Sequence, residues 1–125
     1  LSLFEEWKEY KKPMKEFLND FMKKKKNISE DEKKKYGEIF KKTMDIIYEE
    51  IGQGAFKIKA GINIAVFDSM SVAIASLLNK PLKNIKSNYE NLKKNQGYLD
   101  AISKSTTDSD RVSGRIKMAL STFEK

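Results

Sequence analysis

Residues 62–78, "INIAVFDSMSVAIASLL", form the longest apolar run of the chain. From about residue 63 to residue 78 the apolar side chains surround the whole helical circumference, which predicts a helix that is buried among several neighbours. Asn63 is suited to cap its amino terminus. Because Asn63 and Asp68 interrupt the run, it does not predict a membrane span. Asp68 is the only charge in the segment, and a buried carboxylate needs a partner, so we interpret it as a structural acid, at the helix boundary or paired with a lysine or arginine. The alternative is a functional carboxylate.

The residues before this segment predict further helices. Apolar residues recur every three or four positions from Leu3 to Phe21, and Pro13 either begins a second helix or kinks a single one. "SEDE" at 29–32 is a capping box that starts a long helix, which Gly52 ends. An inward stripe is expected on that helix: Tyr36, Phe40, Met44, Ile47 and Ile51.

Three more helices are expected after the apolar segment. Pro81 is predicted as the first residue of a helix that runs to about residue 94, a short helix covers "YLDAISKS" at 98–105, and Thr107 or Asp108 caps a last helix. The sequence therefore predicts an all-α fold: a single irregular helical bundle over 1–125, with about six or seven helices around the apolar helix at about 63–78.

Composition limits the chemistry that this chain can perform. The 125 residues contain no cysteine and no histidine, which removes thiolate metal sites and the commonest general base. We expect no catalytic residues, no metal and no cofactor. The formal charge of +7 permits binding to nucleic acid without requiring it. The chain begins with Leu1 and carries no signal-peptide pattern, so we interpret it as a cytoplasmic fragment of a longer protein.

The only two arginines, Arg111 and Arg115, lie four residues apart and therefore on one face of the last helix. Positive charge near a helix amino terminus is unfavourable, which suggests an anionic partner. One interpretation is structural, with Asp68, Asp108 or Asp110 as that partner. The other is a phosphate of a nucleotide or of DNA, which the arginines would bind together with the hydroxyls of Thr106 and Thr107.

Three stretches resemble a known family: "FLNDFM" at 17–22, "AFKIKAGINIAVFDSMSVAIA" at 55–75 and "AISKSTTDSDRVSGR" at 101–115. In order and spacing they are similar to the helical region of the GmrSD-type restriction endonuclease N-terminal family. In that family a ParB/sulfiredoxin-like domain with an Asp-Gly-Gln-Gln-Arg motif precedes the helical region, and an HNH nuclease domain often follows. Neither motif occurs here, and Lys57 and Ile64 replace the family's usual arginine and lysine.

The resemblance implies a non-catalytic helical module of a bacterial restriction or phage-defence protein. The module would pack on the ParB-like domain, as its missing partner, and help to position nucleotide or DNA. Its candidate contacts would be Arg111, Arg115, Thr106, Thr107, Lys57 and Asn63. Two alternatives remain open: a protein-interaction module without a ligand, which should expose an apolar patch, and a free-standing DNA-binding domain, which should gather its lysines on one face.

Overall fold

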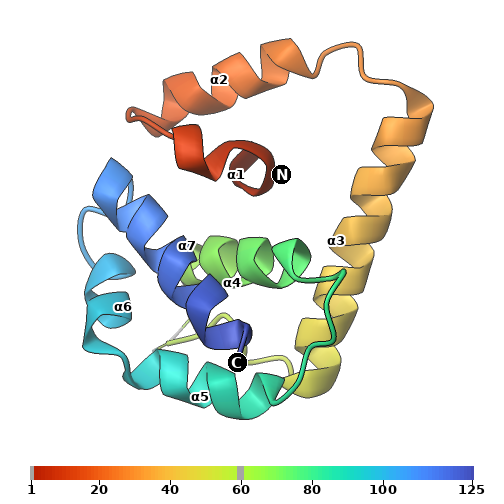
Figure 1. Ribbon diagram of the computed structural model, residues 1–125. Helices are drawn as coiled ribbons and strands as arrows, with labels where there is room; N and C mark the ends of the chain where they lie inside the picture. The colour runs from red at the N-terminus through yellow and green to blue at the C-terminus, as the bar shows by residue number, and fades with distance from the viewer. Residues whose placement is uncertain (1, 59–60) are drawn as a thin grey trace.

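The computed structural model describes residues 2–58 and 61–125, and within these residues the fold is all-α, as predicted (Figure 1). Two short elements open the chain: the helix α1 (Ser2–Glu6) and the 3₁₀ turn η1 (Trp7–Glu9). The remaining helices are α2 (Met14–Lys24), α3 (Glu30–Glu50), α4 (Ile64–Ser76), α5 (Ile85–Lys94), α6 (Gln96–Ala101) and α7 (Ser109–Phe123).

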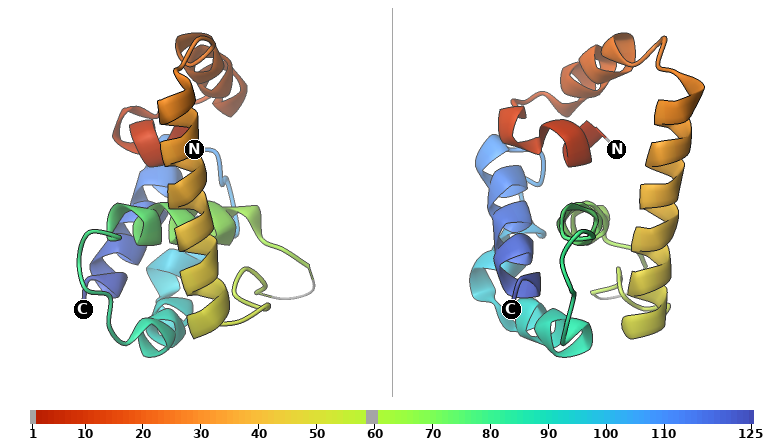
Figure 2. Two further views of the ribbon diagram at one scale, coloured as in Figure 1. Left: turned by 90° about the vertical axis from the view of Figure 1, so that its right-hand side faces the viewer. Right: turned by 45° about the vertical axis from the view of Figure 1, so that its right-hand side comes forward.

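Helix α4 is the centre of the bundle, as the apolar segment predicted. It contacts α1, α3 and α7, and the right-hand view of Figure 2 shows it nearly end-on between α3 and α7. The Asn63 side chain accepts a hydrogen bond from the Val66 backbone N–H at 3.1 Å, which confirms the predicted cap. The helix ends at Ser76, two residues earlier than expected, where the Leu77 N–H turns back to the Ile74 carbonyl.

Helix α3 begins and ends where its sequence signals lie. Ser29 accepts a hydrogen bond from the Glu32 backbone N–H at 3.2 Å, and Gly52, with φ at 107°, lies just beyond the last turn. The predicted inward stripe is only partly correct, because Ile47 is buried whereas Phe40 is 59% exposed. The reason is tertiary: the amino-terminal half of α3 runs past α4 towards α2 (Figure 1).

Two other predicted helix starts differ from the structure. Pro81 is not helical: a turn and then an irregular segment follow α4, and Asn84 adopts the left-handed conformation before α5 begins at Ile85. The short helix α6 begins at Gln96, with Asn95 as its cap, and ends at Ala101, so the predicted range of 98–105 was placed too late. Pro13 directly precedes α2, in agreement with a separate second helix.

The buried side chains form two clusters that share α4. The larger one joins α4 to α5, α6 and α7 and includes Met70, Ile74, Tyr89 and Phe123. The smaller cluster packs the N-terminal elements on α4 and α7 through six residues: Leu3, Trp7, Tyr10, Val72, Val112 and Ile116. None of the helices in the described residues is long and apolar enough to cross a lipid bilayer.

Candidate functional site

The Arg115 side chain is fully engaged inside the protein. Its Nε donates to Asp68 Oδ1 at 2.9 Å and its Nη2 donates to Asp68 Oδ2 at 2.6 Å, so the two groups meet in a two-bond ion pair between α7 and α4. A third bond runs from Arg115 Nη1 to the Thr106 carbonyl at 2.6 Å. Arg115 is only 2% exposed. This guanidinium therefore braces α7 against the central helix and has little access to an external phosphate.

The turn that precedes α7 is held by three consecutive residues. The Thr106 carbonyl accepts a hydrogen bond from the Arg115 guanidinium, and the Thr107 carbonyl accepts one from the Tyr10 hydroxyl. Asp108 pairs with Lys12 at 3.1 Å, rather than with either arginine. The two threonines thus contribute backbone carbonyls to the structure, whereas the sequence suggested a role for their hydroxyls.

Burial dominates the electrostatics of the ion pair. It raises the pKa of the Asp68 carboxyl above its ordinary value, although the Arg115 guanidinium and the Ser69 backbone N–H oppose that shift. Tyr98 lies beside the pair, and its hydroxyl is hydrogen-bonded to Ser69 Oγ at 2.7 Å. Burial likewise raises the pKa of Tyr98 well above the ordinary value of tyrosine. The charged pair is therefore set in a poorly solvated region of the core.

The other candidate contacts do not gather around Arg115. Arg111 is half-buried in the first turn of α7, and no hydrogen bond or ion pair of its side chain is present among the described residues. Lys57 is exposed in the loop after α3. Asn63 caps α4 and also donates to the Ile102 carbonyl at 3.1 Å, so its role is structural. Of the predicted contacts, Arg115 is therefore buried in a structural ion pair, and Arg111, Lys57 and Asn63 are not part of it.

An apolar groove of about 410 Å³ lies between α1, α3 and α4, directly over Asp68. Phe4, Phe40, Met44 and Phe67 are among its lining residues. The Asp68 side chain is 16% exposed and reaches this groove, whereas Arg115 is not among the lining residues. The groove depends on how three helices meet, so helical periodicity alone gave no signal for it.

The surplus of positive charge is concentrated in one part of the sequence. Residues 52–99 contain seven lysines and two acidic residues, whereas the other 77 residues contain 18 basic and 16 acidic ones. One of those two acids is Asp68, which is already paired with Arg115, and the other is Glu90. A count of charge along the sequence could have found this segment.

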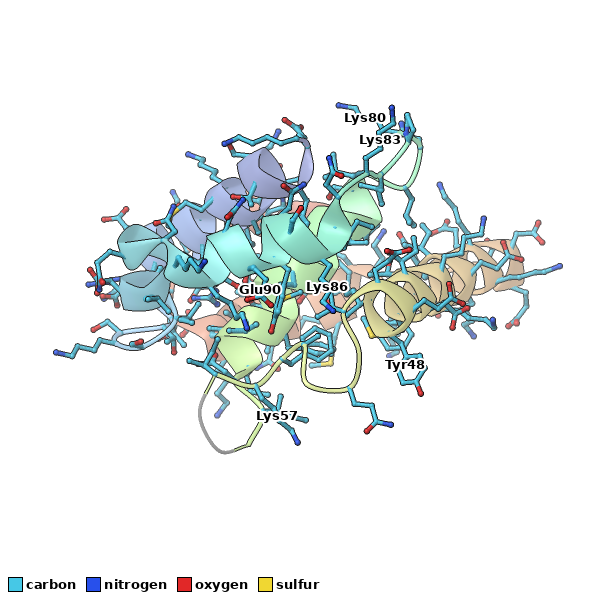
Figure 3. All side chains as sticks on the ribbon, turned by 90° about the horizontal axis from the view of Figure 1, so that it is seen from below. Tyr48, Lys57, Lys80, Lys83, Lys86 and Glu90 are labelled. Carbon is cyan, nitrogen blue, oxygen red and sulfur yellow. The ribbon has the colours of Figure 1, made fainter. Side chains whose placement is uncertain are left out.

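Four of those lysines are found on one face of the molecule, which we call the α5 face. Figure 3 shows Lys57, Lys80, Lys83 and Lys86 on the side seen from below, together with Tyr48 and Glu90. Within the described residues Lys57, Lys83 and Lys86 form no ion pair, and Lys80 lies 3.9 Å from Glu124. Glu90 pairs with Lys93 at 3.5 Å. Most of the positive charge on this face is thus left without a counter-charge.

No three His, Cys, Asp or Glu side chains of residues 2–58 and 61–125 form a group that could hold a metal ion. Comparison with family models, with curated proteins and with solved structures finds no match for this chain.

Proposed function

We propose that this chain is a non-catalytic helical module that holds the phosphate backbone of DNA, as part of a GmrSD-like bacterial restriction protein. The observation that carries the proposal is the α5 face, where Lys80 and Lys83 lie together before α5 and Lys86 follows in the helix (Figure 3). Lys83 and Lys86 form no ion pair among the described residues. Lysine binds phosphate as a mobile point charge, which suits contacts that do not depend on base sequence. The resemblance to the GmrSD helical region supplies the biological setting, in which a ParB-like domain would be the module's partner.

The arginines have a different role in this proposal from the one that their spacing first suggested. Arg115 is occupied by Asp68 and Thr106, so the DNA contacts are assigned to Lys80, Lys83 and Lys86 instead. Arg111 lies in the first turn of α7, at the end of that helix away from α5 (Figure 1). It would not contribute to binding on the α5 face.

The test is a titration of a fluorescein-labelled 20-base-pair duplex with the purified chain, followed by fluorescence anisotropy. Contact with three phosphates predicts a log–log salt slope of about −2.7, which is a loss of about 40-fold in affinity between about 50 and 200 mM salt. Replacing Lys83→Glu and Lys86→Glu should weaken binding at the lower salt concentration by at least about tenfold and flatten the slope.

A matched control is available on another face. Lys34→Glu with Lys35→Glu makes the same change in net charge at exposed positions near the amino terminus of α3. If both pairs of substitutions weaken DNA binding equally, the effect is one of net charge and the α5 face is not the binding site. If the parent chain does not bind the duplex at the lower salt concentration, the proposed function is wrong.

A further inference from the structure

The groove between α1, α3 and α4 has the composition of a small-molecule site. Its volume of about 410 Å³ falls in the range of about 300–1,000 Å³ that is usual for ligand pockets, which are mostly apolar with a few polar groups. Most of its lining residues have apolar side chains, among them Phe4, Phe67 and Met44, and Phe40 remains 59% exposed at this position. Two residues of α4 introduce polar atoms, Asp68 and Ser71.

The Ser71 hydroxyl differs from those of the other two serines in the body of α4. Ser69 donates to the Ala65 carbonyl and Ser76 donates to the Val72 carbonyl, each at 2.7 Å and each four residues back along the helix. Ser71 Oγ is buried and has no hydrogen-bond partner among the described residues. Leaving a buried hydroxyl without a partner is unfavourable. Because Ser71 lines the groove, rotation about its Cα–Cβ bond can offer this hydroxyl to a bound molecule.

Asp68 gives the same end of the groove a negative character. It lies three residues before Ser71, so the two side chains lie on one face of α4. Each carboxylate oxygen accepts one bond from Arg115, and the carboxylate, with about four acceptor sites, keeps capacity for a further donor when the Ser69 backbone N–H is also counted. Arg115 does not line the groove. The group that a ligand would meet is therefore the carboxylate, which favours hydrogen-bond donors and cations and disfavours anions.

We infer that this groove binds a small molecule with an apolar body and a primary amine at one end. The apolar body would lie among Phe4, Phe40, Met44 and Phe67. The ammonium group, which offers three donors, would reach the free lone pairs of Asp68 and the hydroxyl of Ser71. This inference rests on the groove alone, so it stands or falls independently of DNA binding on the α5 face.

Two probes with the same apolar body test the charge preference: 4-phenylbutylamine and 4-phenylbutyrate. We would titrate each into the ¹⁵N-labelled 125-residue chain and follow backbone amide shifts by NMR. The amine should give saturable shifts in 36–44 of α3 and 67–75 of α4, with an affinity at least about tenfold higher than that of the carboxylate. The inference is overturned if the amine causes no saturable shifts by about 5 mM, if the two probes bind equally, or if the shifts map elsewhere.

Variants test the residues in turn. Ala75→Phe fills the groove and should abolish amine binding. Ser71→Ala should weaken it by about fivefold or more without lowering the melting temperature, since the hydroxyl has no internal partner to lose. Ser76→Ala is the matched control, because its hydroxyl already bonds to Val72 and it does not line the groove. If Ser71→Ala and Ser76→Ala bind the amine with the affinity of the parent chain, the assignment of Ser71 is wrong.

Discussion

Replacement of Arg115 by alanine should be among the most damaging single changes to the stability of this protein. The substitution removes two bonds to Asp68 and one to the Thr106 carbonyl, and it leaves a carboxylate in a poorly solvated place. Breaking a buried pair by deleting one partner costs about 3–5 kcal/mol. Because the Asp68 side chain keeps 16% exposure, we expect the lower end, about 3 kcal/mol.

The measurement is urea unfolding, followed by circular dichroism at 222 nm and by the fluorescence of Trp7, the only tryptophan. With a denaturant slope of about 2 kcal/mol/M, a loss of about 3 kcal/mol lowers the unfolding midpoint by about 1.5 M. The double variant Asp68→Asn with Arg115→Met removes both charges and should recover more than half of that loss.

Lys117→Ala is the matched control, because Lys117 is an exposed basic residue on the same helix. It should change the midpoint only slightly. A midpoint for Arg115→Ala that lies within about 0.3 M of the Lys117→Ala value would refute the view that this ion pair braces α7.

Three further substitutions and one titration test other parts of the structure. Arg111→Ala should change the free energy of unfolding, measured with urea, by less than about 0.5 kcal/mol. The reason is that the Arg111 side chain has no hydrogen bond or ion pair to lose among the described residues. Asn63→Ala loses a helix cap and should cost about 1–2 kcal/mol in the same assay. Gly52→Ala places a side chain at φ 107° and should lower the free energy of unfolding by about 1 kcal/mol or more. An unchanged urea midpoint would show that this backbone conformation does not strain an alanine. Tyr98 should stay protonated in the folded protein at a pH where free tyrosine ionises, and a normal absorbance titration at 295 nm would contradict its burial.

The sequence predicted the helix caps and helix ends correctly where they depend on residues that are close in the chain. The caps at Ser29 and Asn63 and the helix end at Gly52 all depend on residues within five positions, and all three lie where the sequence indicated. Phe40 and Pro81 were misassigned because their environment is set by distant segments. Phe40 lies at the groove between α1, α3 and α4, where no neighbouring helix covers it, and the connection after α4 has to cross to the start of α5 before a helix can form.

The candidate sites were predictable to different degrees. The sequence offered Asp68, Asp108 and Asp110 as ion-pair partners of the arginines, with a phosphate as the alternative. It could not select Asp68, because 47 residues separate it from Arg115 and only the packing of α7 on α4 joins them. The groove has no sequence signature, because three helices create it together. The α5 face does have one, in the imbalance of charge over 52–99. The total net charge does not show where the surplus lies. Residues 52–99 carry most of it, because acidic and basic residues nearly cancel in the rest of the chain.

The sharing of α4 between both hydrophobic clusters has a consequence for hydrogen exchange. Amide protons of α4 should exchange with solvent only when the whole molecule unfolds, since loosening either cluster alone leaves the helix packed on the other. The amino-terminal half of α3 is exposed along most of its length, so its amides should exchange through local openings. Trypsin should accordingly cleave first in the lysine run at 23–26, where α2 ends and its connection to α3 begins, while α4 and α7 remain intact.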